Sequence, residues 1–585
     1  MGFLKQFLIS SVVCLMLPVA DAQTPVHVRG WNILSDSYAD AQVTISAAKT
    51  YNINHLQLSH DLVMDLKEIR EPEKQKLVNK LINEAHFAGI NEVVAWDHAF
   101  YDLEYYPDGF KTGPKGTLDL DNPLFWDWFK ADYREMLKLI PGIDGLVLTF
   151  IETGARAENQ YSEKLKTGAE KLAAVVDAVA DVICEEYGKK LYIRTFAYTD
   201  AEYQNTIGCI GHIKNQDIIL MMKETPHDFF LTHPNDKYAG TINRPTIMEF
   251  DCGNEFNGQG VIANTWPEYI IRRWSDLIKR PNVIGYVART DRYRNTRIVG
   301  TPHEINLYAL KRYTEDQSVT PEDIYNEFIT DKYGKESLKY LKPAFKSAYD
   351  IITSSMYTLG TNISNHSKMD FDPYKSSYGR HVSGKWIDPP VVCVPHGVNK
   401  EFHYWSDIIE HLAPARLKEA DGPLKEECPD VLKNGWVSSL EKMDEEYLRY
   451  IITEKDFGVR KAEAALELVR KAEKVMDQDD YDQICRIFER TLITAKTYKA
   501  AATCYFGYRI YARGEAYRSE WLIKTMGKSL DDMLLIADQI DNYQNQVPRG
   551  QWNWRGDAGT LREYYEKITK TGWKEYGNII FQTEK

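Results

Sequence analysis

Glu73 to His98 reads EKQKLVNKLINEAHFAGINEVVAWDH, a helical pattern followed by a strand-like apolar run. In the helical part, Leu77, Leu81 and Ala85 recur at the spacing of one helix face, and Gly89 marks the end of the helix. The run EVVAWDH is short and apolar, which is typical of a buried strand. One helix and one strand in this order predict the repeating unit of an α/β fold.

The same alternation covers the chain from Val26 to about Arg294. Longer amphipathic stretches separate eight apolar runs, which begin at His27, His55, Glu92, Gly145, Leu191, Asp217, Thr246 and Val283. Eight such runs predict a (β/α)8 TIM barrel at residues 23–300. The alternative is an open doubly wound sheet, which is disfavoured because no glycine-rich phosphate loop follows any of the runs.

Beyond Gly300 the sequence changes to long helical patterns, which predict a large α-helical C-terminal domain at 301–585. A helix is expected to begin at Thr320, because Thr-Pro-Glu-Asp supplies an N-cap, a proline at the first helical position and acidic residues in the first turn. A long loop is expected near 360–400, a segment rich in Asn, Ser, Gly and Pro. No Pro/Gly/Ser linker follows the last strand, so we expect this domain to pack against the barrel.

The N-terminus carries the pattern of a cleaved signal peptide at residues 1–22. An apolar stretch at 7–20 ends in Ala20-Asp21-Ala22, a small-x-small cleavage site. We therefore expect a periplasmic or secreted protein with no membrane span in the mature chain. A membrane-anchoring helix is the alternative, and a lipoprotein attached through Cys14 is disfavoured by the bulky residue before it.

Charge and cysteine usage argue against several function classes. The net charge is −13 at pH 7 and the pI is near 5.7, which argues against a nucleic-acid partner. The eight cysteines are scattered, with no CxxC or Cys/His metal spacing, so neither a metal site nor a cofactor is predicted. The sequence leaves open whether the chain forms a homodimer.

Catalytic groups of such barrels lie at the carboxyl ends of the strands. Hydrolysis of a glycosidic bond needs one carboxylic acid to protonate the leaving oxygen and a second carboxylate to attack or to activate water. Carboxylates, basic residues and aromatic rings follow the predicted strands here, which suits a hydroxyl-rich ligand. The alternative for each carboxylate is an ordinary surface charge or a salt bridge to Arg194 or Arg289.

Five segments between Leu118 and Tyr325 resemble, in order, the α-glucuronidases of glycoside hydrolase family 67. They are LDLDNPLFWDWFKADYREMLKLIPGIDGLVLTFIETG, IRTFAY, DIILMMKETPHDFFLTHP, MEFDCGNEFNGQG and IGYVARTDRYRNT. The resemblance implies that Glu152 is the general acid and that Asp228 and Glu255 are the other catalytic carboxylates. Because these residues follow different strands, we expect water to fit between acid and base and the anomeric centre to invert.

The resemblance also implies substrate-binding roles for several basic residues. Together with the polar and aromatic residues at the other strand ends, the predicted substrate-binding set is Trp96, Asp97, His98, Arg156, Arg194, Tyr198, Lys223, His233, Asp291 and Arg292.

Three departures from the family leave the sugar open. The family has a folded domain before the barrel, whereas here almost nothing separates the predicted signal peptide from the first strand. Leu148 stands where the family has a lysine that helps to bind the uronate carboxylate, and His233 stands where it has an arginine. The expected function is an exo-acting, α-glucuronidase-like hydrolase of polysaccharide-derived oligosaccharides. The alternatives are a hydrolase of a neutral or N-acetyl sugar and a non-catalytic carbohydrate-binding barrel.

Overall fold

The computed structural model describes residues 26–197, 200–226, 228–231, 233–358, 361–362, 364–365, 367–369, 444–512, 514–544, 558–566 and 569–570. The predicted signal peptide at 1–22, Tyr198 and most of the predicted loop near 360–400 lie outside these residues.

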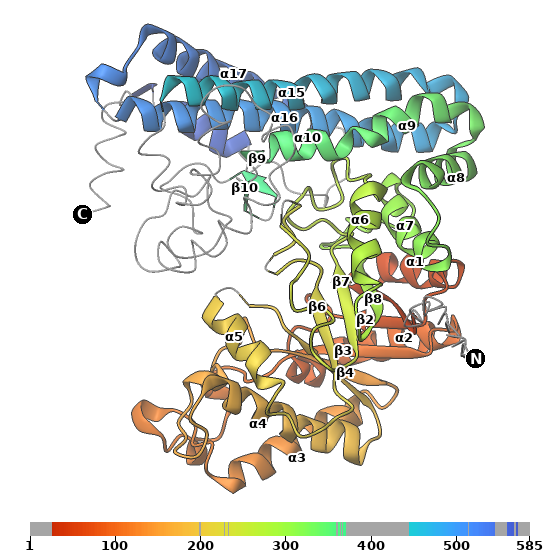
Figure 1. The fold of residues 1–585 in the computed structure, drawn as a ribbon, viewed down its shortest axis with the longest axis vertical. Coiled ribbons are helices and arrows are strands. Elements are labelled where there is room, and N and C mark those ends of the chain that lie inside the picture. The colour runs from red at the N-terminus through yellow and green to blue at the C-terminus, as the bar shows by residue number, and fades with distance from the viewer. Residues whose placement is uncertain are drawn as a thin grey trace, which may run out of the picture.

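Eight parallel strands close into a barrel in the order of the sequence (Figure 1). The last strand pairs with the first, with Gly30 opposite Val287, so the barrel sheet has no free edge. Each strand overlaps one of the eight predicted runs, which confirms the (β/α)8 barrel and excludes the open sheet. The strands are β1 (Val28–Ile33), β2 (His55–Leu58), β3 (Glu92–His98), β4 (Gly145–Thr149), β5 (Lys190–Arg194), β6 (Ile219–Lys223), β7 (Thr246–Phe250) and β8 (Val283–Arg289).

Helices cover the outside of the barrel. The helix predicted from the opening stretch is α2 (Pro72–Phe87), and Gly89 follows it with a φ of 91°, a conformation that favours glycine. The residues described between β6 and β7 form loops instead of a helix. The other helices of the ring are α1 (Tyr38–Ala48), α3 (Pro123–Leu139), α4 (Gly168–Ala180), α5 (Asp200–Cys209), α6 (Pro267–Leu277) and α7 (Ile305–Glu315). The division predicted at residue 300 falls just before α7.

The inside of the barrel has an apolar layer with a charged layer next to it. Val28, Val94, Trp96, Val147, Tyr192, Met221, Ile247 and Val287 form the apolar layer. Alternate residues of a strand share one face, so the residues two positions further along also point inward. On β5 to β8 these residues are Arg194, Lys223, Glu249 and Arg289, and all four are buried. The alternation thus places charges at the carboxyl end of the barrel.

The C-terminal part of the chain is a layer of helices at one end of the barrel (Figure 1). Thr320 caps the first of them and forms a capping box with Asp323, as the sequence predicts. The helices are α8 (Pro321–Tyr333), α9 (Leu338–Lys346), α10 (Ala348–Ser355), α15 (Glu445–Lys471), α16 (Gln478–Ala512) and α17 (Glu520–Gln544). The short strands β9 (Tyr357–Thr358), β10 (Thr361–Asn362), β11 (Ser364–Asn365) and β12 (Lys368–Met369) follow α10.

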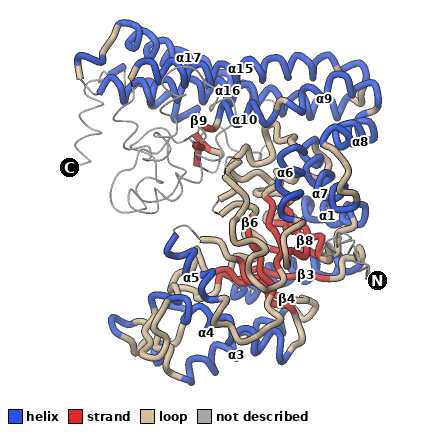
Figure 2. The backbone as a smooth tube through the Cα atoms, in the orientation of Figure 1, coloured by secondary structure: helices blue, strands red, loops and turns tan. Residues whose placement is uncertain are grey.

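The helical layer packs directly on the loops of the barrel (Figure 2). The Ala263 N–H, between β7 and α6, donates to the hydroxyl of Thr491 on α16 at 2.9 Å. The hydroxyl of Thr265 donates to the carbonyl of Phe345 on α9 at 3.0 Å. The predicted packing of the two parts against each other is therefore confirmed.

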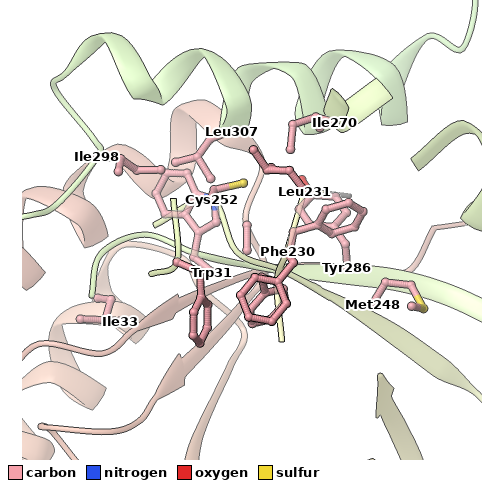
Figure 3. Packing of buried hydrophobic residues seen from close by; sticks show 14 of the residues in the cluster. Trp31, Ile33, Phe230, Leu231, Met248, Cys252, Ile270, Tyr286, Ile298 and Leu307 are labelled. Atoms are coloured by element: carbon pink, nitrogen blue, oxygen red, sulfur yellow. The ribbon is translucent and has the colours of Figure 1, made fainter. Parts of the chain in front are cut away.

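The apolar core continues from the barrel strands into the connection after β6. Figure 3 shows Phe230 and Leu231 of this connection among buried side chains of β1, β7, β8 and the outer helices. The described cysteines are free, and Cys209, Cys252 and Cys504 among them are buried. Among the described residues, no helix is long and apolar enough to cross a membrane.

Candidate active site

A buried carboxylate, Glu249, holds two arginines at the carboxyl end of the barrel. Its side chain is 0 % exposed, and it accepts hydrogen bonds from Nε of Arg194 at 2.7 Å and from Nε of Arg289 at 2.8 Å. Burial alone would raise the pKa of Glu249, but the charges of Arg194, Arg289 and Lys223 outweigh burial and lower it. Glu249 is therefore an ionised anchor that orients both guanidinium groups.

Glu255, a predicted catalytic residue in the loop after β7, joins this network. Its Oε2 lies 2.8 Å from Nη1 of Arg289, and its Oε1 lies 2.7 Å from Nε of Arg292. The salt bridge to Arg289, which the sequence offered as an alternative, is thus present. Both oxygens of this carboxylate are held in place by guanidinium groups.

The second predicted catalytic carboxylate, Asp228, pairs with Lys223. Its Oδ1 lies 2.7 Å from Nζ of Lys223, and both side chains are buried. Burial lowers the pKa of Lys223, and the charge of Asp228 opposes that shift. This ion pair follows β6, whereas Glu255 follows β7, so the two carboxylates come from neighbouring strands.

Two phenylalanine rings connect the two ion-pair groups. The Lys223 ammonium lies 3.5 Å from the centroid of the Phe196 ring and 4.5 Å from that of Phe229. The guanidinium of Arg194 lies 4.8 Å from the Phe196 ring, and that of Arg289 lies 4.8 Å from the Phe229 ring. Because each ring contacts two of these cations, all these groups belong to one cluster.

Glu152, the predicted general acid, lies just after β4 and is the exposed carboxylate of the predicted catalytic set. Its side chain is 41 % exposed, its φ is 64°, and its Oε2 lies 3.8 Å from Nε2 of His98. Nδ1 of His98 lies 2.7 Å from the carbonyl of Met64, which can only accept, so Nδ1 carries the hydrogen. Burial lowers the pKa of His98, so the neutral ring turns an acceptor toward Glu152.

Trp96 belongs to the inner apolar layer and packs against the charge cluster. Its Nε1 donates to Oε1 of Gln57 at 2.8 Å, and its ring centroid lies 4.7 Å from the Arg194 guanidinium. The ring is fully buried. Trp96 therefore positions Arg194, in place of the predicted direct contact with a sugar.

Asp97 faces away from the site, although the sequence predicted it to bind substrate. Its oxygens accept hydrogen bonds from the Leu66 N–H at 2.9 Å and from the hydroxyls of Tyr101 and Tyr133 on the outer side of the barrel. Burial raises its pKa to about 6. Neighbouring residues of a strand point to opposite faces, so Asp97 points outward because Trp96 points inward.

Asp291 is also a structural residue in this fold. Its two oxygens accept the N–H groups of Leu34 at 2.8 Å and Ser35 at 3.1 Å, which ties the loop after β8 to the loop after β1. Burial raises its pKa to about 7. Of the predicted pair, only Arg292 reaches the charge cluster.

Three further residues of interest lie outside the cluster. Arg156 pairs with Glu158 at 3.0 Å and with Glu202 on α5 at 2.9 Å. The ring of His233 is buried against Phe230, with centroids 5.1 Å apart. Leu148 belongs to the apolar layer between the strands and the helices. A lysine at that position would not face the barrel interior.

Sequence reasoning left Glu249 and Asp251 out of the site. Glu249 lies two residues after the inward-facing Ile247, so counting the strand alternation from the apolar layer would have found it. Oδ2 of Asp251 accepts the N–H of Glu255 at 2.7 Å, and burial raises the pKa of Asp251 to about 7. No pattern in the sequence predicts the contact between Asp251 and Glu255, because it depends on the turn that the loop makes.

The ion pairs of the cluster contain more cations than carboxylates. The cations are Arg194, Lys223, Arg289 and Arg292, and the carboxylates are Glu249, Asp228 and Glu255. Asp251, whose pKa burial raises to about 7, adds a negative charge only as it ionises. Below about pH 7 one positive charge is therefore left over, which suits an anionic ligand in a buried setting. Within the described part of the chain, no group of His, Cys, Asp and Glu side chains is arranged to hold a metal ion.

Comparison with solved structures finds a chain of similar fold. A GH138 enzyme that targets the pectin rhamnogalacturonan II matches 94% of this chain and 85% of its own length, at 12% identity and a TM-score of 0.58. This similarity shows a shared fold.

Two looser similarities have lower TM-scores. The GH115 4-O-methyl-α-glucuronidase BtGH115A, with specificity for decorated arabinogalactans, has a TM-score of 0.48 at 11% identity and covers 91% of this chain and 60% of its own. CpGH84B has a TM-score of 0.41 at 10% identity and covers 89% and 74%. No family model and no curated protein matches the sequence, so membership of family 67 stays a prediction.

Proposed function

We propose that the protein is an exported, exo-acting glycoside hydrolase of the α-glucuronidase type that acts on polysaccharide-derived oligosaccharides. One observation carries the proposal. Asp228 and Glu255, from neighbouring strands, lie in one cation-rich cluster at the carboxyl end of the barrel, where such enzymes have their active sites. Glu152 adds an exposed carboxylate at the end of β4, next to the neutral ring of His98.

In the proposed reaction, Glu152 donates its proton to the leaving glycosidic oxygen. The neutral ring of His98 turns an acceptor nitrogen toward this carboxyl group. Asp228 and Glu255 orient a water on the opposite face of the sugar. The water oxygen bonds to the anomeric carbon as the glycosidic bond breaks, and one of the two carboxylates takes the proton of the water. Acid and base on different strands leave room for that water, which is the arrangement of an inverting enzyme.

The excess positive charge favours a uronic acid as the sugar. Lys223 and Arg194 lie on the inner face of the barrel, side by side around the Phe196 ring, where they can bind a carboxylate. The GH138 enzyme of similar fold targets a pectin, and pectins are acidic polysaccharides, which agrees with this choice.

Exchange of the general acid tests the proposal. Glu152→Gln should lower hydrolysis of unactivated glucuronic-acid-capped oligosaccharides by roughly 10²–10⁴-fold, because an amide cannot protonate the leaving oxygen. Aryl glycosides with a good leaving group should lose much less. Glu163→Gln, an exposed carboxylate in the same connection, is the matched control and should keep wild-type rates.

Three outcomes would each overturn a part of the proposal. Equal losses on both substrate classes would exclude Glu152 as the acid. Tight binding of oligosaccharides without turnover by the wild-type chain would favour a carbohydrate-binding barrel. Proton NMR of the first product formed tests inversion, and a retained anomer would exclude a water-activating pair.

A further inference from the structure

Tyr357, in the helical region, binds both loops that carry the proposed catalytic carboxylates. Its hydroxyl accepts the N–H of Leu231 at 2.9 Å and donates to Oδ1 of Asn257 at 2.5 Å. Leu231 lies three residues after Asp228, and Asn257 lies two residues after Glu255. A single buried phenol therefore joins the two loops within a few residues of each carboxylate.

The two loops also contact each other at this point. Nδ2 of Asn257 donates to the carbonyl of Phe229 at 3.0 Å, and the rings of Phe230 and Phe256 pack with centroids 5.0 Å apart. Leu231 is buried in the apolar core beside Phe230 (Figure 3). Short, buried tethers of this kind transmit a shift of the phenol to both loops.

The helical region holds Tyr357 rigidly. Lys455 of α15 is buried, and its ammonium donates to the carbonyls of Ser354 at 3.0 Å, Ser355 at 3.1 Å and Tyr357. These carbonyls lie at and just after the C-terminus of α10, where a cation is favourable. A second tie comes from Ser367, whose hydroxyl accepts the Gly258 N–H at 2.7 Å and donates to the carbonyl of Glu255 at 2.8 Å.

We propose that Tyr357 is a positioning residue through which the helical region sets the distance between Asp228 and Glu255. The inference rests on the proposed function, because the proposed function assigns these two carboxylates to one water molecule. Catalytic groups must be held within about 0.5 Å of their working geometry. A displacement of about 1 Å can lower the rate roughly 10²-fold. The helical region is therefore part of the active-site machinery and more than a support for the barrel.

The test compares two buried tyrosines. Tyr357→Phe keeps the ring and removes both hydrogen bonds to the loops. Tyr325→Phe is the matched control, since the Tyr325 hydroxyl lies 3.1 Å from the carbonyl of Thr265 and 2.7 Å from Glu268, away from both carboxylates. We expect similar losses of thermal stability. Tyr357→Phe should lower kcat roughly 10- to 100-fold with KM within about threefold, and Tyr325→Phe should keep kcat within about twofold.

Amide hydrogen exchange supplies a readout that does not depend on activity. Residues 228–231 and 254–258 should exchange faster in Tyr357→Phe than in the wild type or in Tyr325→Phe. Faster exchange in one loop only, or unchanged kcat despite faster exchange in both, would overturn the positioning role. A wild-type chain without hydrolase activity would overturn the proposed function. The exchange result would still decide whether Tyr357 holds the two loops together. Should Tyr357→Phe fail to fold, Ser367→Ala removes a tie to the 254–258 loop alone. Faster exchange in that loop with a lower kcat would then support control of Glu255 by the helical region, and an unchanged kcat would overturn it.

Discussion

Replacement of Glu249 by glutamine should damage both stability and activity. The carboxylate is fully buried and neutralises Arg194 and Arg289. Glutamine has the same size, so Glu249→Gln creates no cavity, and the change isolates the lost charge. Two guanidinium groups then share a buried site without their common counter-ion.

The expected loss follows from the burial of these groups. Removing one partner of a buried ion pair costs about 3–5 kcal/mol, because the remaining charge stays desolvated. For a barrel of this size that loss corresponds to a fall in Tm of roughly 10 °C. The pKa of Glu249 is lowered by folding, so its contribution is present above about pH 4.3 and is lost as the pH falls through its folded pKa. The difference from the wild type should therefore shrink in acid.

Glu92 provides the control at the opposite end of the barrel. It accepts a hydrogen bond from Tyr192 and pairs with Lys190 and with His55 at 3.1 Å, and these contacts outweigh burial and lower its pKa to about 2. Glu92→Gln should cost about 3 kcal/mol. Because Glu92 is remote from the cluster, this variant should keep wild-type kcat at temperatures where it is folded.

Calorimetry and turnover at 25 °C decide the matter together. We expect both variants to melt lower, and only Glu249→Gln to lose at least about 100-fold in kcat/KM, since Arg194 and Arg289 lose their common anchor. Equal activity losses would show that general instability explains the effect. Wild-type turnover of Glu249→Gln would refute the view that this carboxylate orients the site.

Two other predictions concern stability. Asp251→Asn should raise the free energy of unfolding by roughly 1.5 kcal/mol at pH 5 and by up to about 4 kcal/mol at pH 8. Burial raises the pKa of Asp251 to about 7, so the wild type loses stability as the pH rises from about 3.9 to 7, whereas asparagine stays neutral. An equal difference at both pH values would contradict this assignment. Lys455→Met should lower the urea midpoint by the equivalent of about 3 kcal/mol, because three buried carbonyls lose their donor. Lys461→Met, which removes an exposed pair at 3.5 Å from Asp350, should change stability by less than about 0.5 kcal/mol, and equal effects of the two changes would exclude the buried role.

The barrel could be predicted from the sequence because its signals are local. Strands buried on both sides are short apolar runs, and amphipathic helices repeat every 3.6 residues, so both are visible within windows of about 15 residues. The carboxyl ends of the strands could be located in the sequence in the same way. Arg194, Lys223, Asp228, Glu255 and Arg292 all belong to the cluster that the structure forms.

The directions of individual side chains were not decided by the same local patterns. Asp97 and Asp291 have residue types that suit a sugar site, yet one faces outward and the other ties two loops together. At a strand end, one position along the chain moves a side chain to the opposite face. Residue type predicts what a side chain can do, and only the register and the loop path decide what it meets.

By itself, the sequence determined the α/β class, the eight strands, the capped helix at Thr320 and the carboxylates at the barrel end. Only the tertiary structure decided that Glu249 anchors two arginines and that Tyr357 lies against loops about 100 residues before it in the chain. Contacts across such separations carry no local periodicity. They form because closing the barrel and packing the helical layer bring distant segments together, and buried polar groups must then find partners there.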